Sequence, residues 1–399
     1  MKTRIPSAGT PLLLNDIASA TAGLWRHQID RYISRLKSYL QTPDLCLVNS
    51  GTTAGYITML ALAQRSSRRE VIIPAYTAPS LTLPIRKAGL IPRCCEVSLE
   101  TFNLDHDSLD AAITSDTLCV MPVHMFGLAS DVAAIRRVIA DRDIAVIDDA
   151  ASSFGTTVQG KQTGTLGDVG FISFNRGKNL STLVGGAVAT EDDELFELIE
   201  AERKKLPIAN MTHQAKLLLN LTALSVAVRP VGYTLLHALI SRYKYTSLHT
   251  DFVSFQFPDV LAGAGITLMN RAEAICDLRH RNGSFLGDSL QGLSGIRTPV
   301  LIDQTYTVYN QFPVLVDDPE LRSRLVGMIF ERTGVEVTKL YPDPLHRIYD
   351  MGYGGTDDPF PNASYMSDHI ILIPTHPLID STTLTNIVDT IRSALSRGA

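Results

Sequence analysis

The chain has 399 residues, of which 45% are hydrophobic and 19% charged, and its formal net charge is −5. This composition is typical of a soluble globular enzyme, and the length suits a large α/β domain with a smaller second one. The net negative charge, without a basic patch, argues against a nucleic-acid partner. Five cysteines without a C-x-x-C pair predict reduced, mostly buried thiols and no metal site, and the N-terminal sequence lacks the apolar core of a signal peptide, so a cytoplasmic location is expected.

Strand and helix patterns alternate at short intervals up to about residue 150. A helix is expected over residues 15–42, followed by a strand, a turn and a helix over 45–64. Further strands are expected at 70–77, 89–97, 117–127 and 144–155. Helices are expected between them, one that ends at Lys87 and two more at 107–113 and 130–143. This alternation predicts a mainly parallel sheet with crossover helices.

The most hydrophobic segment, residues 216–245, reads KLLLNLTALSVAVRPVGYTLLHALISRYKY. A membrane-spanning helix needs about 20 uninterrupted apolar residues. Here Asn220, the Arg229-Pro230 pair and His237 interrupt the run. We therefore expect two amphipathic helices that meet at Pro230. Two roles fit such a pair: burial in the core or in a dimer interface, or docking on a membrane surface with the help of flanking basic residues.

The pattern changes after residue 250. Residues 260–292 predict a long helix, 305–316 a strand, 318–333 a helix, and 363–396 a helix–strand–helix unit. We interpret residues 1–250 as a large domain that includes the N-terminal helix and the apolar segment. Residues 251–399 are interpreted as a small C-terminal α+β domain.

A stretch of small polar residues, NSGTTAG at 49–55, follows the first predicted strand and opens a helix. Ligands of open α/β sheets bind beyond the carboxyl ends of the strands, and a helix N-terminus favours an anion. Thr52 and Thr53 add hydroxyl donors, so the stretch suits a phosphate group. It equally fits an ordinary helix start capped by Ser50 or Thr52.

Two acidic residues and one lysine stand near the ends of later strands. VIDDAASSFG places Asp148 and Asp149 at a carboxyl end, where burial is unfavourable without a cationic partner. GFISFNRGKNL places Lys178 in a polar turn, with Ser173 on the preceding strand. Taken singly, these residues also fit a helix cap, a surface acid and a solvated lysine at a hairpin tip.

A phosphate cradle, a buried acid and a lysine in one pocket are what pyridoxal phosphate requires. Lysine forms the Schiff base with this cofactor, the acid holds its pyridine nitrogen protonated, and the phosphate sits on a helix start. The released lysine can then carry a proton between carbon atoms as a general acid and base. Ser173 would add a hydrogen bond to the phosphate.

The ordered set of motifs resembles the DegT/DnrJ/EryC1/StrS family, the sugar-type aminotransferases of the aspartate aminotransferase fold, which is fold type I of the pyridoxal-phosphate enzymes. Matching segments occur over nearly the whole chain, among them NSGTTAG, EVIIPAYT, VMPVHMFG, VIDDAASSFG, GFISFNRGKNL, GGAVAT, YPDPLH and ILIPTHPLI. The resemblance implies Lys178 as the Schiff-base lysine, Asp149 as partner of the pyridine nitrogen, and Thr52, Thr53 and Ser173 around the phosphate. It also implies a homodimer with shared active sites.

Several positions depart from the family pattern. The family usually carries Gln or His where Ser152 stands, near the phenolic oxygen of the cofactor, and a ring-stacking aromatic residue at Ala78. Tyr76 or His124 is a candidate to replace that aromatic residue. Val184 stands where the family usually has a Glu before the paired glycines. Ser254 and Gln256 stand where the family has the Asn and the Arg of an Asn-x-Arg motif.

The function implied by the resemblance is amino transfer, with glutamate as the expected donor, to a keto sugar carried on a nucleotide, for a surface polysaccharide or a glycosylated metabolite. Some relatives have His in place of the lysine and are dehydratases, and Lys178 argues against that branch. Two alternatives stay open. One is an aminotransferase acting on a lipid-linked acceptor at the inner face of the membrane; the other is a non-catalytic regulator or scaffold that binds pyridoxal phosphate or sugar.

Overall fold

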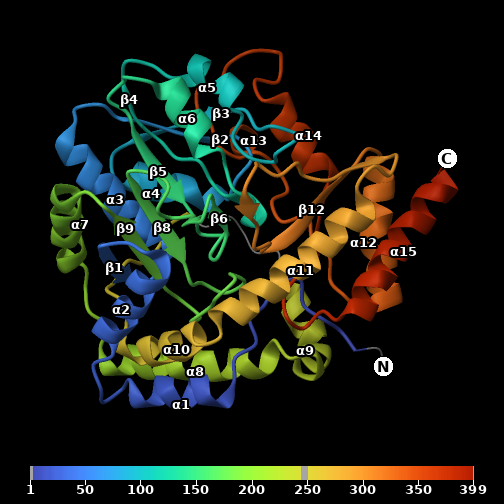
Figure 1. Cartoon of the computed structure of the whole chain (residues 1–399), viewed down its shortest axis with the longest axis horizontal. Coiled ribbons are helices and arrows are strands. Elements are labelled where there is room, and N and C mark those ends of the chain that lie inside the picture. Colours follow the sequence, from blue (N-terminus) through green and yellow to red (C-terminus); the bar gives the residue numbers. More distant parts are fainter. Residues whose placement is uncertain (1–2, 244–249, 399) are drawn as a thin grey trace.

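A seven-stranded sheet forms the centre of the computed structural model, which describes residues 3–243 and 250–398 (Figure 1). The strand order is β1-β9-β8-β5-β4-β2-β3. The strands are β1 (Asp44–Val48), β2 (Glu70–Pro74), β3 (Ile91–Cys95), β4 (Thr117–Val120), β5 (Ala145–Asp149), β8 (Val169–Ser173) and β9 (Gly186–Thr190). Strands β3, β2, β4, β5 and β8 are parallel, whereas β9 is antiparallel to both β8 and β1. The predicted mainly parallel sheet is confirmed.

Helices cover both faces of this sheet. The helices of this part of the molecule are α1 (Leu14–Ala22), α2 (Ile29–Leu40), α3 (Gly51–Arg65), α4 (Thr82–Lys87), α5 (His106–Ala112), α6 (Val132–Ile139), α7 (Asp193–Lys205) and α10 (Asp259–Met269). Short 3-10 turns occur at Pro79–Leu81 and Met125–Gly127. Successive residues of a strand point to opposite faces. Ile73 accordingly packs in the cluster with α3, α4 and α7, and Ile72 packs with α5 and α6. Near β1 the second face is covered by α2 and α10.

The C-terminal part builds a second, smaller sheet with its own helices. Its order is β10-β12-β13, and all its pairs are antiparallel. The elements are α11 (Ala272–Leu290), β10 (Ile296–Arg297), β12 (Gln311–Val316), α12 (Pro319–Thr333), α13 (Leu345–Ile348), α14 (Pro361–His369), β13 (Ile370–Pro374) and α15 (Ser381–Gly398). A third small sheet joins β11 (Thr305–Tyr306) to β6 (Thr157–Val158) and β7 (Lys161–Gln162). The division into domains at residue 250 stays a prediction.

Three elements expected to be continuous are broken. The helix expected over 15–42 is interrupted after α1 at Gly23, where a Cβ atom would lie 2.6 Å from the Asp259 carbonyl oxygen, so a close approach to α10 requires glycine there. The helix expected over 260–292 is broken between α10 and α11, where the Arg271 guanidinium pairs with the buried Asp16 of α1. The strand expected over 305–316 is divided between two sheets, as β11 and β12.

The apolar segment forms two helices that meet at Pro230, as predicted: α8 (Met211–Ala227) and α9 (Pro230–Tyr243), with residues 244 and 245 outside the described part. Figure 1 shows α8 beside α1 and α10 on the side of the molecule away from α5 and α6. No single described helix is long and apolar enough to cross a bilayer. The pair Met211–Ala227 and Pro230–His237 passes that test only when joined, and it is bent by 95°.

Candidate active site

The carboxyl ends of β1, β5 and β8 meet at one edge of the large sheet. Strand β9 is antiparallel to both β8 and β1, so β1 and β8 run in the same direction. Ser50 after β1, Asp149 at the end of β5 and Ser173 at the end of β8 therefore lie at the same edge. The residues at the β1 and β8 ends are separated only by Gly185 and Gly186, which bridge to Ser50 and pair with Ser173.

The N-terminus of α3 forms a narrow cradle against Ser173. Ser50 caps the helix, because its hydroxyl oxygen accepts a 3.0 Å hydrogen bond from the Thr53 backbone N–H. A Cβ atom at Gly51 would lie 2.9 Å from the Ser173 Cβ, so only glycine lets the helix start come this close to the strand. The predicted phosphate residues Thr52 and Ser173 are thus brought together at a helix N-terminus, which favours an anion.

Thr53 is buried one residue further into α3, and its hydroxyl group is already engaged. It accepts a hydrogen bond from Ser50 Oγ at 3.0 Å and donates one to Ser254 Oγ at 3.3 Å. Ser254, aligned with the first residue of the family's Asn-x-Arg, therefore reaches the cradle of its own chain. Gln256, at the other end of that motif, is held instead by Arg203, which donates to its side-chain oxygen at 3.0 Å.

Asp149 is a buried carboxylate at the centre of the edge. Its side chain is 4% exposed, and its Oδ1 accepts the Ala151 N–H at 2.9 Å. Burial raises the pKa of Asp149 to about 6, and the hydrogen bond from Ala151 and the charge of Lys178 oppose this rise only in part. The carboxylate therefore lacks a full cationic partner.

Lys178 lies in the long loop between β8 and β9 and is half-buried there, not solvated at a hairpin tip. Its Nζ donates a 2.8 Å hydrogen bond to Ser152 Oγ. Burial lowers the pKa of the Lys178 amine, and the negative charge of Asp149 acts in the opposite direction. A lowered pKa increases the neutral, nucleophilic fraction of the amine.

The N-terminal segment, residues 5–12, fixes the backbone of the β8–β9 loop that carries Lys178, which we call the lysine loop. The Thr10 hydroxyl lies 2.9 Å from the Lys178 carbonyl oxygen and 2.8 Å from that of Asn179. Asn310 donates to the Gly177 carbonyl oxygen at 2.8 Å and to the Asn179 side-chain oxygen at 3.1 Å. Sequence reasoning assigned no role to this segment, because it carries no charged or nucleophilic motif.

His124 and Asp148 form a buried pair next to Asp149. His124 Nε2 contacts Asp148 Oδ1, and His124 Nδ1 accepts the Ser130 N–H at 2.8 Å, which places the ring proton on Nε2. The second Asp148 oxygen accepts the N–H groups of Gly164 at 2.8 Å and Leu166 at 2.7 Å. Both side chains are fully buried, and these contacts use their polar atoms to hold the strand ends in place.

Two tyrosines from distant parts of the chain, Tyr76 and Tyr341, pack against each other with ring centroids 6.0 Å apart. Tyr76 is buried and its hydroxyl group lies 3.3 Å from the Tyr341 carbonyl oxygen. The negative charge of Asp149 contributes, after burial, to raising the pKa of Tyr341, so Tyr341 lies within electrostatic reach of the site. Sequence reasoning missed Tyr341, although the YPDPLH motif that contains it was among the matching segments.

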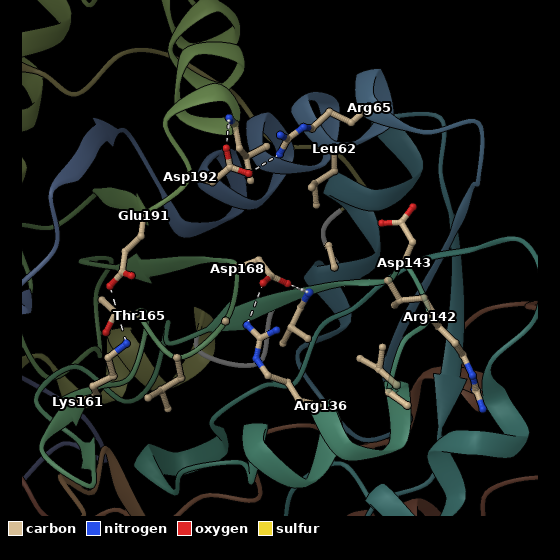
Figure 2. Close-up of a pocket in the computed structure, with 18 residues that line it drawn as sticks. Leu62, Arg65, Arg136, Arg142, Asp143, Lys161, Thr165, Asp168, Glu191 and Asp192 are labelled. Carbon is tan, nitrogen blue, oxygen red and sulfur yellow. Dashed lines mark hydrogen bonds and ion pairs between the residues drawn. The ribbon is translucent and has the colours of Figure 1, made fainter.

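A large cleft of about 800 Å³ lies elsewhere, at the amino ends of β5 and β8 (Figure 2). Its wall residues include Ala145 and Asp168, which start or precede these strands, whereas Asp149 and Ser173 end them. Figure 2 shows several of its charged side chains joined in ion pairs, whereas Arg142 points away from them. These pairs are Arg136–Asp168 at 2.9 Å, Arg65–Asp192 at 2.5 Å and Lys161–Glu191 at 3.8 Å. Since each of these cations is already neutralised, the cleft is not a candidate catalytic centre.

The residues at the Lys178 edge fit pyridoxal phosphate. The glycine-lined start of α3 with Thr52 and Ser173 suits the phosphate, and the Asp149 carboxylate would gain the cation it lacks from a protonated pyridine nitrogen. The Lys178 amine supplies the nucleophile for the aldehyde. Among residues 3–243 and 250–398, no group of three or more His, Cys, Asp or Glu side chains could hold a metal ion, and all five cysteines are buried thiols.

A family model and several known proteins are similar in sequence to this chain. A family model described as the DegT/DnrJ/EryC1/StrS aminotransferase family matches residues 17–392. GDP-perosamine synthase of Caulobacter vibrioides is 33% identical over 175 residues, which are 43% of this chain and 47% of that protein. The spore coat polysaccharide biosynthesis protein SpsC of Bacillus subtilis is 23% identical over 92% of this chain and 89% of its own length.

A solved structure of similar fold contains the cofactor itself. The E. coli GDP-4-keto-6-deoxy-D-mannose-3-dehydratase with bound hydrated PLP superposes with a TM-score of 0.77 at 18% identity, over 99% of this chain and all of that one. At this identity the likeness shows the fold, which is that of the type I pyridoxal-phosphate enzymes.

Proposed function

Because the chain belongs to the DegT/DnrJ/EryC1/StrS aminotransferase family, we propose that it moves an amino group from glutamate to a keto sugar carried on a nucleotide. The observation that carries this proposal is the grouping of Lys178, the buried Asp149 and the start of α3 at one sheet edge. The lysine distinguishes the site from that of relatives with His at this position, which are dehydratases. The product would enter a surface polysaccharide or a glycosylated metabolite.

Pyridoxal phosphate, the family's cofactor, supplies the electron sink that makes the α-proton of an amino acid removable. The chain's own residues do the rest. The α3 N-terminus with Thr52 and Ser173 binds the phosphate, and Asp149 holds a proton on the ring nitrogen by electrostatic attraction. Lys178 Nζ removes a proton from one carbon atom and returns it to another, as general base and then acid.

Ser152 holds the lysine between these steps. Its Oγ accepts a hydrogen bond from Nζ at 2.8 Å, which aims the amine across the site when it is not bound to the cofactor. The Thr10 contact fixes the backbone that carries the lysine. The nucleotide of the acceptor would supply binding energy remote from the reacting carbon and thereby orient a sugar that has few features to grip.

The test is the visible absorbance of the purified protein with added pyridoxal phosphate, before and after glutamate, beside Lys178→Ala. We expect a visible band in the wild type that glutamate removes, no such band in the variant, and amino transfer lowered by at least about 10³-fold in the variant. The protein is then incubated with GDP-4-keto-6-deoxy-D-mannose and glutamate. An aminated product identifies an aminotransferase, and a deoxygenated product identifies a dehydratase. A protein that takes up no cofactor would favour the non-catalytic scaffold.

We also propose that the active form is a cytoplasmic homodimer with active sites shared between subunits. The support is the family relationship. Light scattering of the purified protein tests the oligomeric state.

A further inference from the structure

The outer sides of α8 and α9 expose an unusual concentration of large apolar side chains. Six of the 17 large apolar side chains that are exposed in the described part of the chain belong to these two helices, and Leu219 and Leu235 are 69% and 74% exposed. The six, which we call the outer face, are Met211, Leu219, Val226, Val231, Leu235 and Leu236. Exposed apolar patches of this kind mark interaction sites.

The opposite side of each helix is firmly packed, so the exposure of the outer face does not reflect a loosely attached segment. Leu217 and Leu221 of α8 are buried in the cluster that includes α10, and the Gln214 side-chain oxygen accepts the Val260 N–H at 3.1 Å. In α9, Tyr233 is buried with its hydroxyl group on Glu336, and His237 stacks on Phe330 of α12 with ring centroids 5.4 Å apart. The two helices are therefore presented at a fixed position on the molecule.

The charged residues of the two helices and of the chain segment that flanks them have a single sign. Residues 203–250 contain seven Lys or Arg and no Asp or Glu, although the whole chain carries a net charge of −5. Within this segment Lys216 and Arg229 are exposed on α8 and at the elbow between the helices. The neighbouring α1 has one acidic residue, Asp16, which is buried and neutralised by Arg271. No described side chain of α1, α8 or α9 offers an exposed carboxylate.

This combination decides between the two occupants that could cover an apolar face. A second copy of the chain in a two-fold dimer would place the same helices opposite each other and bring basic groups against basic groups. A bilayer with anionic headgroups offers both the apolar depth for the leucines and the negative charge for Lys216 and Arg229. The bend of 95° and the packed inner sides fit helices that lie on a bilayer surface and do not cross it.

We propose that the outer face of α8 and α9 docks the protein on an anionic lipid bilayer surface. The proposal does not depend on the reaction catalysed. If both hold, the enzyme works at the inner face of the membrane, and its acceptor sugar is one that is used or carried there. The lipid-linked acceptor considered from the sequence would meet the active site in that location.

The experiment is flotation of the purified full-length protein with vesicles of phosphatidylcholine alone or of phosphatidylcholine mixed with phosphatidylglycerol. We expect binding to the mixed vesicles that weakens as salt rises, and little binding to the neutral ones. Leu219→Glu and Leu235→Glu should each lower the affinity for mixed vesicles by about tenfold, because each removes one buried leucine from the bilayer. Lys216→Glu should weaken binding to mixed vesicles only.

Ile91→Glu and Val300→Glu are matched controls, since these side chains are 54% and 59% exposed but lie outside the two helices, and they should bind as the wild type does. Lys178→Ala should also bind normally, which separates this result from the fate of the proposed reaction. Equal binding of the wild type and the outer-face variants, or no binding to mixed vesicles, would overturn the proposal. Loss of dimers in light scattering on Leu219→Glu, without an effect on vesicles, would show that a second chain covers the face.

Discussion

The Lys178 amine lies 2.8 Å from the hydroxyl oxygen of Ser152, a residue on the loop that follows β5. This contact joins the β8–β9 loop to the segment after the strand that ends in Asp149, so Lys178 and Asp149, the two residues proposed to act in the chemistry, are positioned by neighbouring strands. The family usually has a longer Gln or His side chain at this position. A serine leaves more space beside the lysine.

Replacing Ser152 tests the importance of that contact. Ser152→Ala removes the acceptor and should lower kcat/KM for amino transfer by about tenfold, the effect of one lost hydrogen bond to a charged or partly charged amine. Ser152→Gln restores a polar group of the kind that the family carries and should retain more activity than Ser152→Ala. Steady-state kinetics on both variants give the answer, and equal loss in the two would mean that space, not hydrogen bonding, matters at residue 152.

Asp149 should make the cofactor-free protein less stable as pH rises. Its pKa is raised in the folded state, from 3.8 to about 6, so its protonated form is favoured by folding. The contribution of Asp149 to the free energy of unfolding is fully present below pH 3.8. It is lost as the pH rises to about 6, and the total loss is about 3 kcal/mol for a pKa shift of this size. Lys178, with its lowered pKa, acts in the opposite direction at high pH.

Asp149→Asn should therefore flatten the decline in unfolding free energy between pH 4 and about 6. The same variant should lose cofactor affinity, because the ring nitrogen loses its negative partner. Urea unfolding across this pH range, without and with pyridoxal phosphate, measures both effects. A variant with the same pH profile as the wild type would contradict the assigned pKa.

Gly51 should tolerate no larger residue. In Gly51→Ala the new Cβ would be 2.9 Å from the Ser173 Cβ, so the start of α3 must move away from the strand. Overpacking of this kind costs about 1–3 kcal/mol of stability, and the phosphate cradle would widen. Fluorescence titration should show pyridoxal-phosphate affinity lowered by about tenfold or more. Gly327→Ala in α12, where a Cβ atom meets nothing within 4 Å, is the control and should leave affinity unchanged.

The two sides of α8 should differ in their effect on stability. Leu221 is fully buried, so Leu221→Ala should lower the free energy of unfolding by about 2–5 kcal/mol. Leu219 is two residues earlier and 69% exposed, so Leu219→Ala should lower the free energy of unfolding by less than about 0.5 kcal/mol. Chemical denaturation of both variants compares them. Similar losses would mean that the outer face is covered in the purified protein.

The sequence predicted the elements that strong local signals define and failed where distant contacts decide. Pro230 was enough to place the division between α8 and α9. The side of α8 that faces solvent was not predictable, because leucines occur on both sides of the helix. The break at Arg271 depends on its pairing with Asp16, 255 residues away, which no local pattern shows.

The same distinction holds for the site. Asp149, Ser173 and Lys178 could be predicted as candidates because Asp149 and Ser173 end strands, and Lys178 follows a strand, at one edge of the sheet. Their roles stay predictions. Tyr341 and Thr10 were missed, since each reaches the site through the packing of segments far from it in sequence. The engagement of the Thr53 hydroxyl by Ser254 was likewise a matter of tertiary contact.

The segment over the lysine loop also ties the candidate site to the C-terminal part of the chain. Pro6, Ser7 and Gly9 are held through their carbonyl oxygens by His376 at 2.8 Å, Gln311 at 3.0 Å and the buried Arg279 at 3.1 Å. Residues 6–9 thus bind partners that follow them by 270 to 370 positions in the sequence. A chain that ended before residue 279 would contain Lys178 but none of the three groups that hold this segment, so the Thr10 contact with the lysine loop depends on the C-terminal part of the protein.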